Sequence, residues 1–176
     1  MVKKPRFIAH WFLISLLLFN GISAIFGSLA MMIYPDGDLL KMPLEMLRGT
    51  PFKNYFIPGV LLFVFNGLLP IMAAAGLLKR RPEKALPGFG ILSNYHWAWS
   101  LSLISGIGLI VWILVQIAMI GFWRENLIQA ICLTEGLMIV VLTLLPSVQT
   151  NYALPKTLRK KKISKNGVNR ELLKRG

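Results

Sequence analysis

The sequence has few of the residues that most enzymes use for chemistry. Its 176 residues include one cysteine, two histidines and seven acidic residues. Because Cys132 stands alone, no internal disulfide can form, which excludes the paired-cysteine chemistry of four-helix thiol oxidoreductases. His10 and His96 are far apart in the sequence and lack partner carboxylates, whereas a metal site needs three or four ligands. We therefore expect no metal and no cofactor, and we identify no catalytic residue.

Charged residues are also scarce, at 15% of the chain against 55% hydrophobic residues. A soluble domain is about a quarter charged. The apolar residues form four runs, at 7–34, 55–78, 97–122 and 127–145. Each run is near or above the roughly 20 residues that cross a hydrocarbon core. The first is too long for the h-region of a signal peptide, which has about 7–15 residues. The sequence predicts an all-α bundle of four transmembrane helices over residues 1–146.

Lys and Arg are distributed unequally between the two sides of these runs. Of the 20 basic residues, 16 lie before the first run, between the second and third, and after Pro155, and four lie on the other side. The positive-inside rule then places both termini in the cytoplasm. We expect a multi-pass protein of the bacterial cytoplasmic (inner) membrane.

Residues 147–176 form a basic tail, which we expect to be mostly disordered and cytoplasmic. Its basic residues include Lys160, Lys161 and Lys162. Near a membrane surface each would add about 1 kcal/mol of attraction to anionic lipid. No aromatic residue that could stack on a base is interleaved with them, so nucleic acid is not an expected partner.

The connection between the first two runs, residues 35–54, has its own pattern. Pro35-Asp36-Gly37-Asp38 is a turn signal, and apolar residues then alternate with charged ones. Pro43 suits the first turn of a helix and Gly49 suits its C-terminal cap. We predict a short amphipathic helix on the outer surface, which could act as a lid over the bundle. A solvated connector with some lipid contact fits the pattern equally well.

Five polar residues fall within the apolar runs. Asn20, Asn66 and Glu135 lie near the midpoints of runs one, two and four, close to the bilayer centre. Gln116 and Gln129 lie about 10 Å and 9 Å from the centre, toward the outer face, at ~1.5 Å per residue. Intramembrane polar residues are candidates for a functional site.

Pro70 adds an irregularity to the second run. It has no N–H to donate to the carbonyl four residues before it, which belongs to Asn66. We predict a helix kink at Pro70, and a freed carbonyl at membrane depth that protein, water or a bound group must satisfy.

Two interpretations of the five polar residues remain open. In the first, Glu135, Asn66, Asn20, Gln116 and Gln129 line a ligand or proton site, a small polar cavity open toward the outer side. A low dielectric disfavours a charged carboxyl, so Glu135 could exchange a proton or pair with a cationic ligand. In the second, a protonated Glu135 hydrogen-bonds the asparagines, and these bonds only hold the helices in register.

Several segments resemble those of small bacterial four-helix integral membrane proteins of unassigned function. They are Pro35–Leu40, Pro43–Leu47, Thr50–Phe52, Tyr55–Gly59 and Trp112–Gln116, the last followed by Gly121 and Phe122. The resemblance extends to about Pro146 and excludes the basic tail. It implies the four-span architecture, and it brings no activity, substrate or catalytic residue.

Three classes of function are compatible with the sequence. The first is a non-enzymatic module that binds or moves a small or lipophilic molecule through the cavity around Glu135. The second is a structural or accessory membrane subunit whose polar layer only packs helices. An enzyme acting on lipid is the least supported, because general acid–base chemistry usually needs a second titratable group in reach. Four helices are few for a transporter acting alone, which favours a homodimer or a partner membrane protein.

Overall fold

The computed structural model describes residues 4–79, 95–122 and 127–153, and they are almost entirely helical. The long helices are α1 (Lys4–Ile33), α4 (Trp97–Ile120) and α5 (Ile128–Leu144). A second long helix is built from α2 (Phe56–Leu62), the π-helical segment η3 (Phe63–Leu68) and α3 (Leu69–Lys79). The short elements are the 3₁₀ turns η1 (Asp38–Leu40) and η2 (Leu44–Leu47), and the helix α6 (Pro146–Tyr152). The prediction of an all-α fold is confirmed for these residues.

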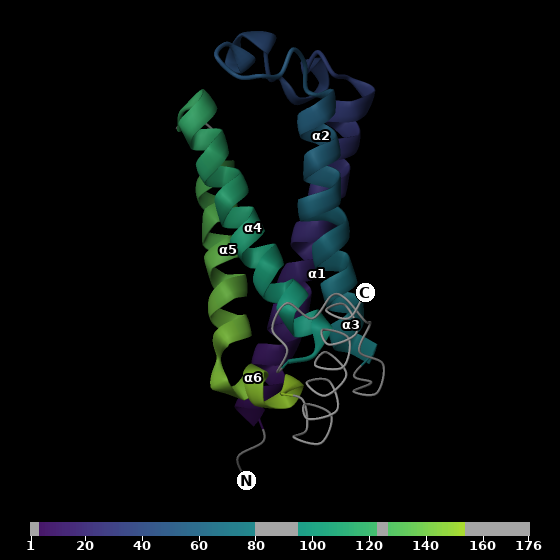
Figure 1. The fold of residues 1–176 in the computed structure, drawn as a ribbon, viewed down its shortest axis with the longest axis vertical. Coiled ribbons are helices and arrows are strands. Elements are labelled where there is room, and N and C mark those ends of the chain that lie inside the picture. The colour runs from purple at the N-terminus through teal and green to yellow at the C-terminus, as the bar shows by residue number, and fades with distance from the viewer. Residues whose placement is uncertain (1–3, 80–94, 123–126, 154–176) are drawn as a thin grey trace, which may run out of the picture.

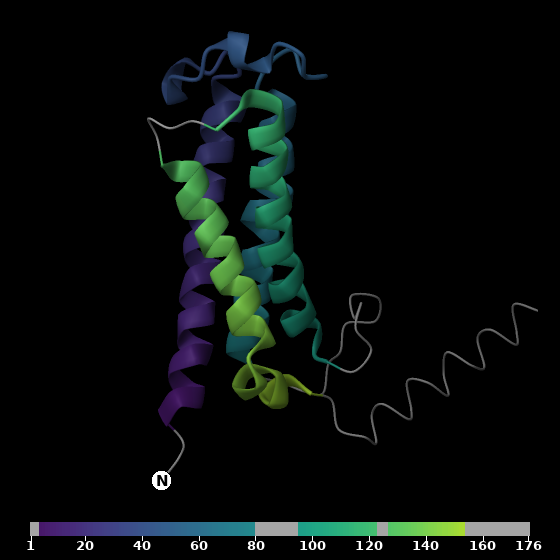
Figure 2. The same ribbon diagram turned by 90° about the vertical axis from the view of Figure 1, so that its left-hand side faces the viewer.

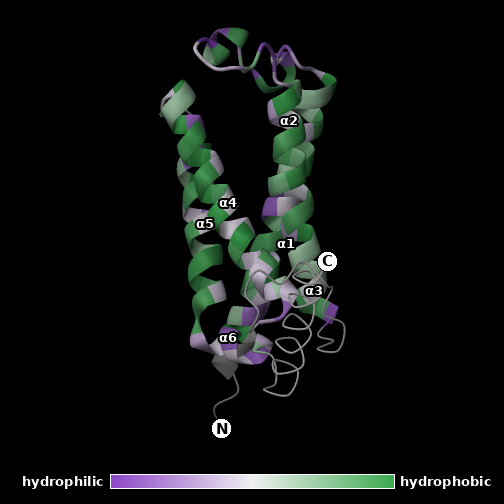
Figure 3. Cartoon of the chain, viewed as in Figure 1, coloured by the Kyte–Doolittle hydropathy of each residue, from purple (hydrophilic) through white to green (hydrophobic). Residues whose placement is uncertain are grey.

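Three of the described helices are long and apolar enough to cross a membrane, at Ile8–Ile33, Phe56–Lys79 and Trp97–Ile120. A fourth is reached if α5 and α6, which meet at a bend of 61°, count as one broken span. Figure 3 shows apolar residues along the helices and more polar residues at both ends of the bundle. The predicted spans therefore coincide with the observed helices to within a few residues.

Pro146 separates α5 from α6. Proline has no N–H for a continuing helix and disfavours the helical conformation of the residue before it. Leu145 accordingly has an extended backbone, with φ −56° and ψ 132°, and Pro146 begins the next helix. Val148 and Tyr152 of α6 are buried against the bundle, and the domain boundary at residue 146 stays a prediction. Lys160, Lys161 and Lys162 lie outside the described residues.

The long helices form two antiparallel pairs, α1 with α2–η3–α3 and α4 with α5 (Figure 1). The pairs meet at the end of the bundle that holds α6, where α4 packs closely against α3, and they diverge toward the end that holds η1 and η2. We call these the α6 end and the loop end. The main apolar core lies toward the α6 end and includes Leu13, Leu17, Leu77 and Trp99. The divergence leaves space between the pairs in the loop half.

Two glycines allow α4 and α5 to approach closely. A side-chain carbon placed on Gly106 would lie 2.9 Å from methyl carbons of Ile139 and Val140, and 3.1 Å from the Val140 backbone nitrogen. A side-chain carbon on Gly136 would lie 3.2 Å from the Gly106 carbonyl oxygen. Small residues at such crossings let helix backbones pack against each other in membranes. The short distance between α4 and α5 therefore depends on glycine at both positions.

Tyr152 connects α6 to the α1 and α3 helices above it. Its hydroxyl donates to the Leu77 carbonyl at 3.2 Å and lies 3.0 Å from Nδ1 of His10. Both Tyr152 and His10 are buried. The two histidines at this end thus contact one tyrosine, because the His96 backbone N–H also donates to the Tyr152 carbonyl at 2.9 Å.

Replacing Tyr152 with phenylalanine should lower the free energy of unfolding by about 1–3 kcal/mol, because the Leu77 carbonyl and the His10 ring then lose the Tyr152 hydroxyl as a hydrogen-bond partner. The measurement is thermal unfolding in detergent. Tyr34→Phe is the matched control, since Tyr34 is 48% exposed. Equal melting temperatures for the two variants would show that the Tyr152 hydroxyl does not stabilise the α6 end.

The connection between α1 and α2 differs from the single short helix that the sequence predicts. It contains two 3₁₀ turns, because Lys41 adopts a left-handed backbone with φ 54° and Pro43 is extended. Leu47 is buried with Tyr55 and Met31, and the Tyr55 hydroxyl donates to the Pro43 carbonyl at 3.1 Å. The connection therefore folds over the loop end of α1 and α2.

Candidate functional site

A cavity of about 400 Å³ lies between the two helix pairs in the loop half of the bundle. It receives side chains from α1, from the α2–η3 segment, from α4, from α5 and, through Met42, from the connection. Its polar lining includes all five residues singled out from the sequence, namely Asn20, Asn66, Gln116, Gln129 and Glu135. The structure thus brings these five together, although their role as a ligand or proton site stays a prediction.

The three residues of the central layer are buried without hydrogen bonds to one another. Asn20, Asn66 and Glu135 are 5%, 1% and 8% exposed. Both amide atoms of Asn66, Nδ2 of Asn20 and Oε1 of Glu135 have no hydrogen-bond partner in the described part of the chain. Buried polar groups in native proteins are nearly always hydrogen-bonded, so unpaired ones require an explanation. The bonds from Glu135 to the asparagines that the packing interpretation needs are not formed.

Asn66 owes its position to the π-helical segment η3. The Leu69 N–H donates to the carbonyl of Val64, five residues earlier, instead of four. Short π-helical stretches inside α-helices often occur at functional sites. The segment ends at Leu68, two residues before Pro70, where the sequence predicts an irregularity. The structure shows a π turn there, and the kink itself stays a prediction.

Two glycines bring η3 close to α1 beside the cavity. A side-chain carbon on Gly67 would lie 3.0 Å from Cγ1 of Ile25, and one on Gly21 would lie 2.5 Å from Cγ1 of Ile71. Glycine at both positions lets the helices approach there. The facing edge of α1 carries Asn20, so both asparagines lie on the same side of the cavity lining, on the first helix pair.

Gln116 and Gln129 lie on the second helix pair, in α4 and α5. Gln129 is buried, and its Nε2 donates to the Gly121 carbonyl at the end of α4 over a long 3.4 Å. Gln116 is half-buried. The polar lining therefore comes from both helix pairs. The asparagines lie on the first pair, and the glutamines and Glu135 lie on the second pair.

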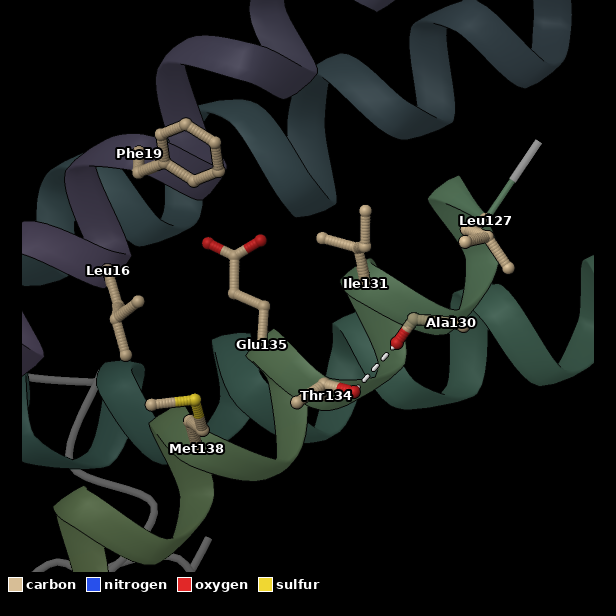
Figure 4. A pocket seen from close by; sticks show the side chains of 8 residues that line it. All are labelled: Leu16, Phe19, Leu127, Ala130, Ile131, Thr134, Glu135 and Met138. Atoms are coloured by element: carbon tan, nitrogen blue, oxygen red, sulfur yellow. Dashed lines mark hydrogen bonds between the residues drawn. The ribbon is translucent and has the colours of Figure 1, made fainter.

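A second hollow, which sequence reasoning missed, meets the cavity at Glu135. It is an open groove of about 410 Å³ between α1 and α5, lined by Leu16, Phe19, Leu127, Ala130, Ile131, Thr134, Glu135 and Met138 (Figure 4). Glu135 extends from α5 toward α1 between Phe19 and Ile131, and all three line both hollows. In the sequence, Leu127, Ile131 and Glu135 are spaced four residues apart, which places them on one edge of a helix. This spacing could have indicated the α5 side of the groove, but the sequence does not show that α1 forms the other side.

The charge of the site is one-sided. Among the described lining residues, Glu135 and Cys132 are the titratable side chains of the cavity, and no described Lys, Arg or His lines either hollow. Among the described residues, no group of three or more His, Cys, Asp or Glu side chains could hold a metal ion. An ionised Glu135 therefore has no counter-charge among the described residues of the lining, and the site is suited to a cation.

The fold and the site together define an all-helical protein, with several helices of membrane-spanning length around a small polar pocket. Comparison of the chain with models of protein families, with curated proteins and with solved structures found no match.

Proposed function

We propose that the chain is a four-span protein of the bacterial cytoplasmic membrane with both termini in the cytoplasm. Two observations support this topology. The described chain begins at the α6 end with Lys4 and returns to it at Ala153 (Figure 2). The basic residues before α1, between α3 and α4 and after Pro155 would then all lie on that side of the membrane, as the positive-inside rule requires.

We further propose that the protein binds or moves a small or lipophilic molecule in the cavity around Glu135, without catalysing a reaction. The observation that carries this proposal is Asn66, which is 1% exposed, lines the cavity and has both amide atoms unpaired. A polar group in this state is stabilised when a ligand completes its hydrogen bonds. The cavity volume lies within the roughly 300–1,000 Å³ of small-molecule sites.

Infrared difference spectroscopy of the protein in bilayers tests this proposal. If the cavity is reached from outside, the Glu135 carboxyl should lose its proton as the pH of the medium rises and regain it as the pH falls. A small amine added at constant pH should change the same signal. Glu135→Gln is the control that identifies the band, because it removes the carboxyl and keeps the shape of the side chain.

The alternative is a structural or accessory subunit, in which the polar layer only packs helices and the basic tail binds anionic lipid or a partner. A protonated-carboxyl signal from Glu135 that responds neither to pH nor to the amine would favour this alternative. It would also mean that the cavity around Glu135 is closed to small molecules.

A further inference from the structure

The position of Glu135 between two hollows has a consequence for the kind of ligand. On one side of its carboxyl lies the cavity with the unpaired asparagines, and on the other lies the more open groove between α1 and α5. Phe19 and Ile131 flank the carboxyl at this junction (Figure 4). A molecule that binds the carboxyl can therefore have one part in each hollow.

The two hollows differ in chemistry. The cavity holds the polar atoms of Asn20 and Asn66 that have no hydrogen-bond partner. The groove is lined by apolar side chains apart from Glu135 and Thr134, and the Thr134 hydroxyl already donates to the Ala130 carbonyl at 2.8 Å. The groove thus offers hydrocarbon contacts, whereas the cavity offers hydrogen bonds.

The dimensions and the charge define the ligand further. The groove follows α5 from Leu127 to Met138, which is ~16 Å at ~1.5 Å per residue. In the proposed topology this face of the helices meets the lipid. No basic side chain in the described ranges lines either hollow, so a cationic group on the ligand would be the counter-charge of Glu135. An ammonium group also donates hydrogen bonds that the Asn66 carbonyl oxygen can accept.

We propose that the groove between α1 and α5 holds the hydrocarbon chain of a single-chain lipophilic amine, which enters from the lipid and places its ammonium group in the cavity at Glu135. This inference rests on the proposed function and adds to it the class of ligand and the route of entry. Desolvation in the cavity strengthens the ion pair, and the chain gains apolar contacts along α5.

A photoreactive dodecylamine, with a diazirine at the far end of its chain, tests the proposal on the full protein in lipid nanodiscs. Illumination should label peptides of α1 and α5 that line the groove. Unlabelled dodecylamine should compete with the probe, and dodecanol, which has the same chain without the charge, should not. Glu135→Gln should reduce the labelling to the level seen with excess competitor.

Blocking the groove provides a second readout. Ala130 lines the groove and not the cavity, so Ala130→Trp should reduce labelling about tenfold while Glu135 remains in place. Ala118→Trp is the matched control, because Ala118 is exposed on α4 and lines neither hollow. Both variants should unfold at the temperature of the wild type.

The outcomes separate the inference from the proposed function. Labelling that depends on Glu135 but is unchanged in Ala130→Trp would overturn the groove as the route and leave the cavity as the binding site. An infrared response of Glu135 without any Glu135-dependent amine labelling would overturn the ligand class alone. If both the infrared response and the labelling are absent, the proposed function fails together with this inference.

Discussion

Glu135→Gln is expected to weaken the binding of a lipophilic amine by roughly 30-fold to a few thousandfold. The carboxylate is the one acidic group among the described residues of the lining, and glutamine keeps its size while removing its charge. Loss of one member of a buried charge pair typically costs 2–5 kcal/mol, and each 1.4 kcal/mol is about tenfold in affinity. The measurement is equilibrium binding of dodecylamine to the protein in nanodiscs, corrected for uptake by empty nanodiscs.

The pH dependence of the same binding has a defined sign. In the wild type, affinity should fall as the pH is lowered, because protonation of Glu135 removes the negative charge that pairs with the ammonium group. In Glu135→Gln this dependence should disappear. Glu45→Gln serves as the control, since it neutralises an exposed acidic residue in the η2 turn, away from the cavity. Unchanged affinity in Glu135→Gln would show that the amine does not bind at this carboxyl.

Gly106→Leu should strongly destabilise the packing of α4 against α5. The new side chain would meet Ile139, Val140 and the Val140 backbone at about 3 Å or less, and backbone cannot move aside as a flexible side chain can. Overpacking a close contact costs about 1–3 kcal/mol and sometimes more. Since the α4–α5 pair forms one wall of the cavity, amine binding should be lost with it.

Gly108→Leu supplies the matched control on the same helix. A side-chain carbon at Gly108 meets no atom within 4 Å, and the change from glycine to leucine favours the helix by roughly 1 kcal/mol in both variants. Thermal unfolding in detergent should therefore place Gly106→Leu well below the wild type and Gly108→Leu at or above it. Similar melting temperatures for the two variants would contradict the close crossing of α4 and α5.

The sequence by itself predicted where the long helices lie and at which level along them their polar residues fall. Both are local properties: an apolar run of sufficient length forms a helix, and a constant rise per residue converts position into depth. For this reason Asn20, Asn66 and Glu135 could be assigned to one layer before their helices were placed. The connection at 35–54 and the segment after residue 145 were predicted less well, because short turns and the docking of α6 depend on the surfaces they contact.

The tertiary structure alone decided which side chains share a space. Divergence of the helix pairs toward the loop end creates the cavity, and close contact at Gly106 and Gly136 fixes one of its walls. The exposure of Glu135 to a groove depends on α1 lying beside α5, two helices at opposite ends of the chain. Hydropathy and spacing describe one helix at a time, whereas a cavity or groove is defined by the relative position of several, which only packing determines.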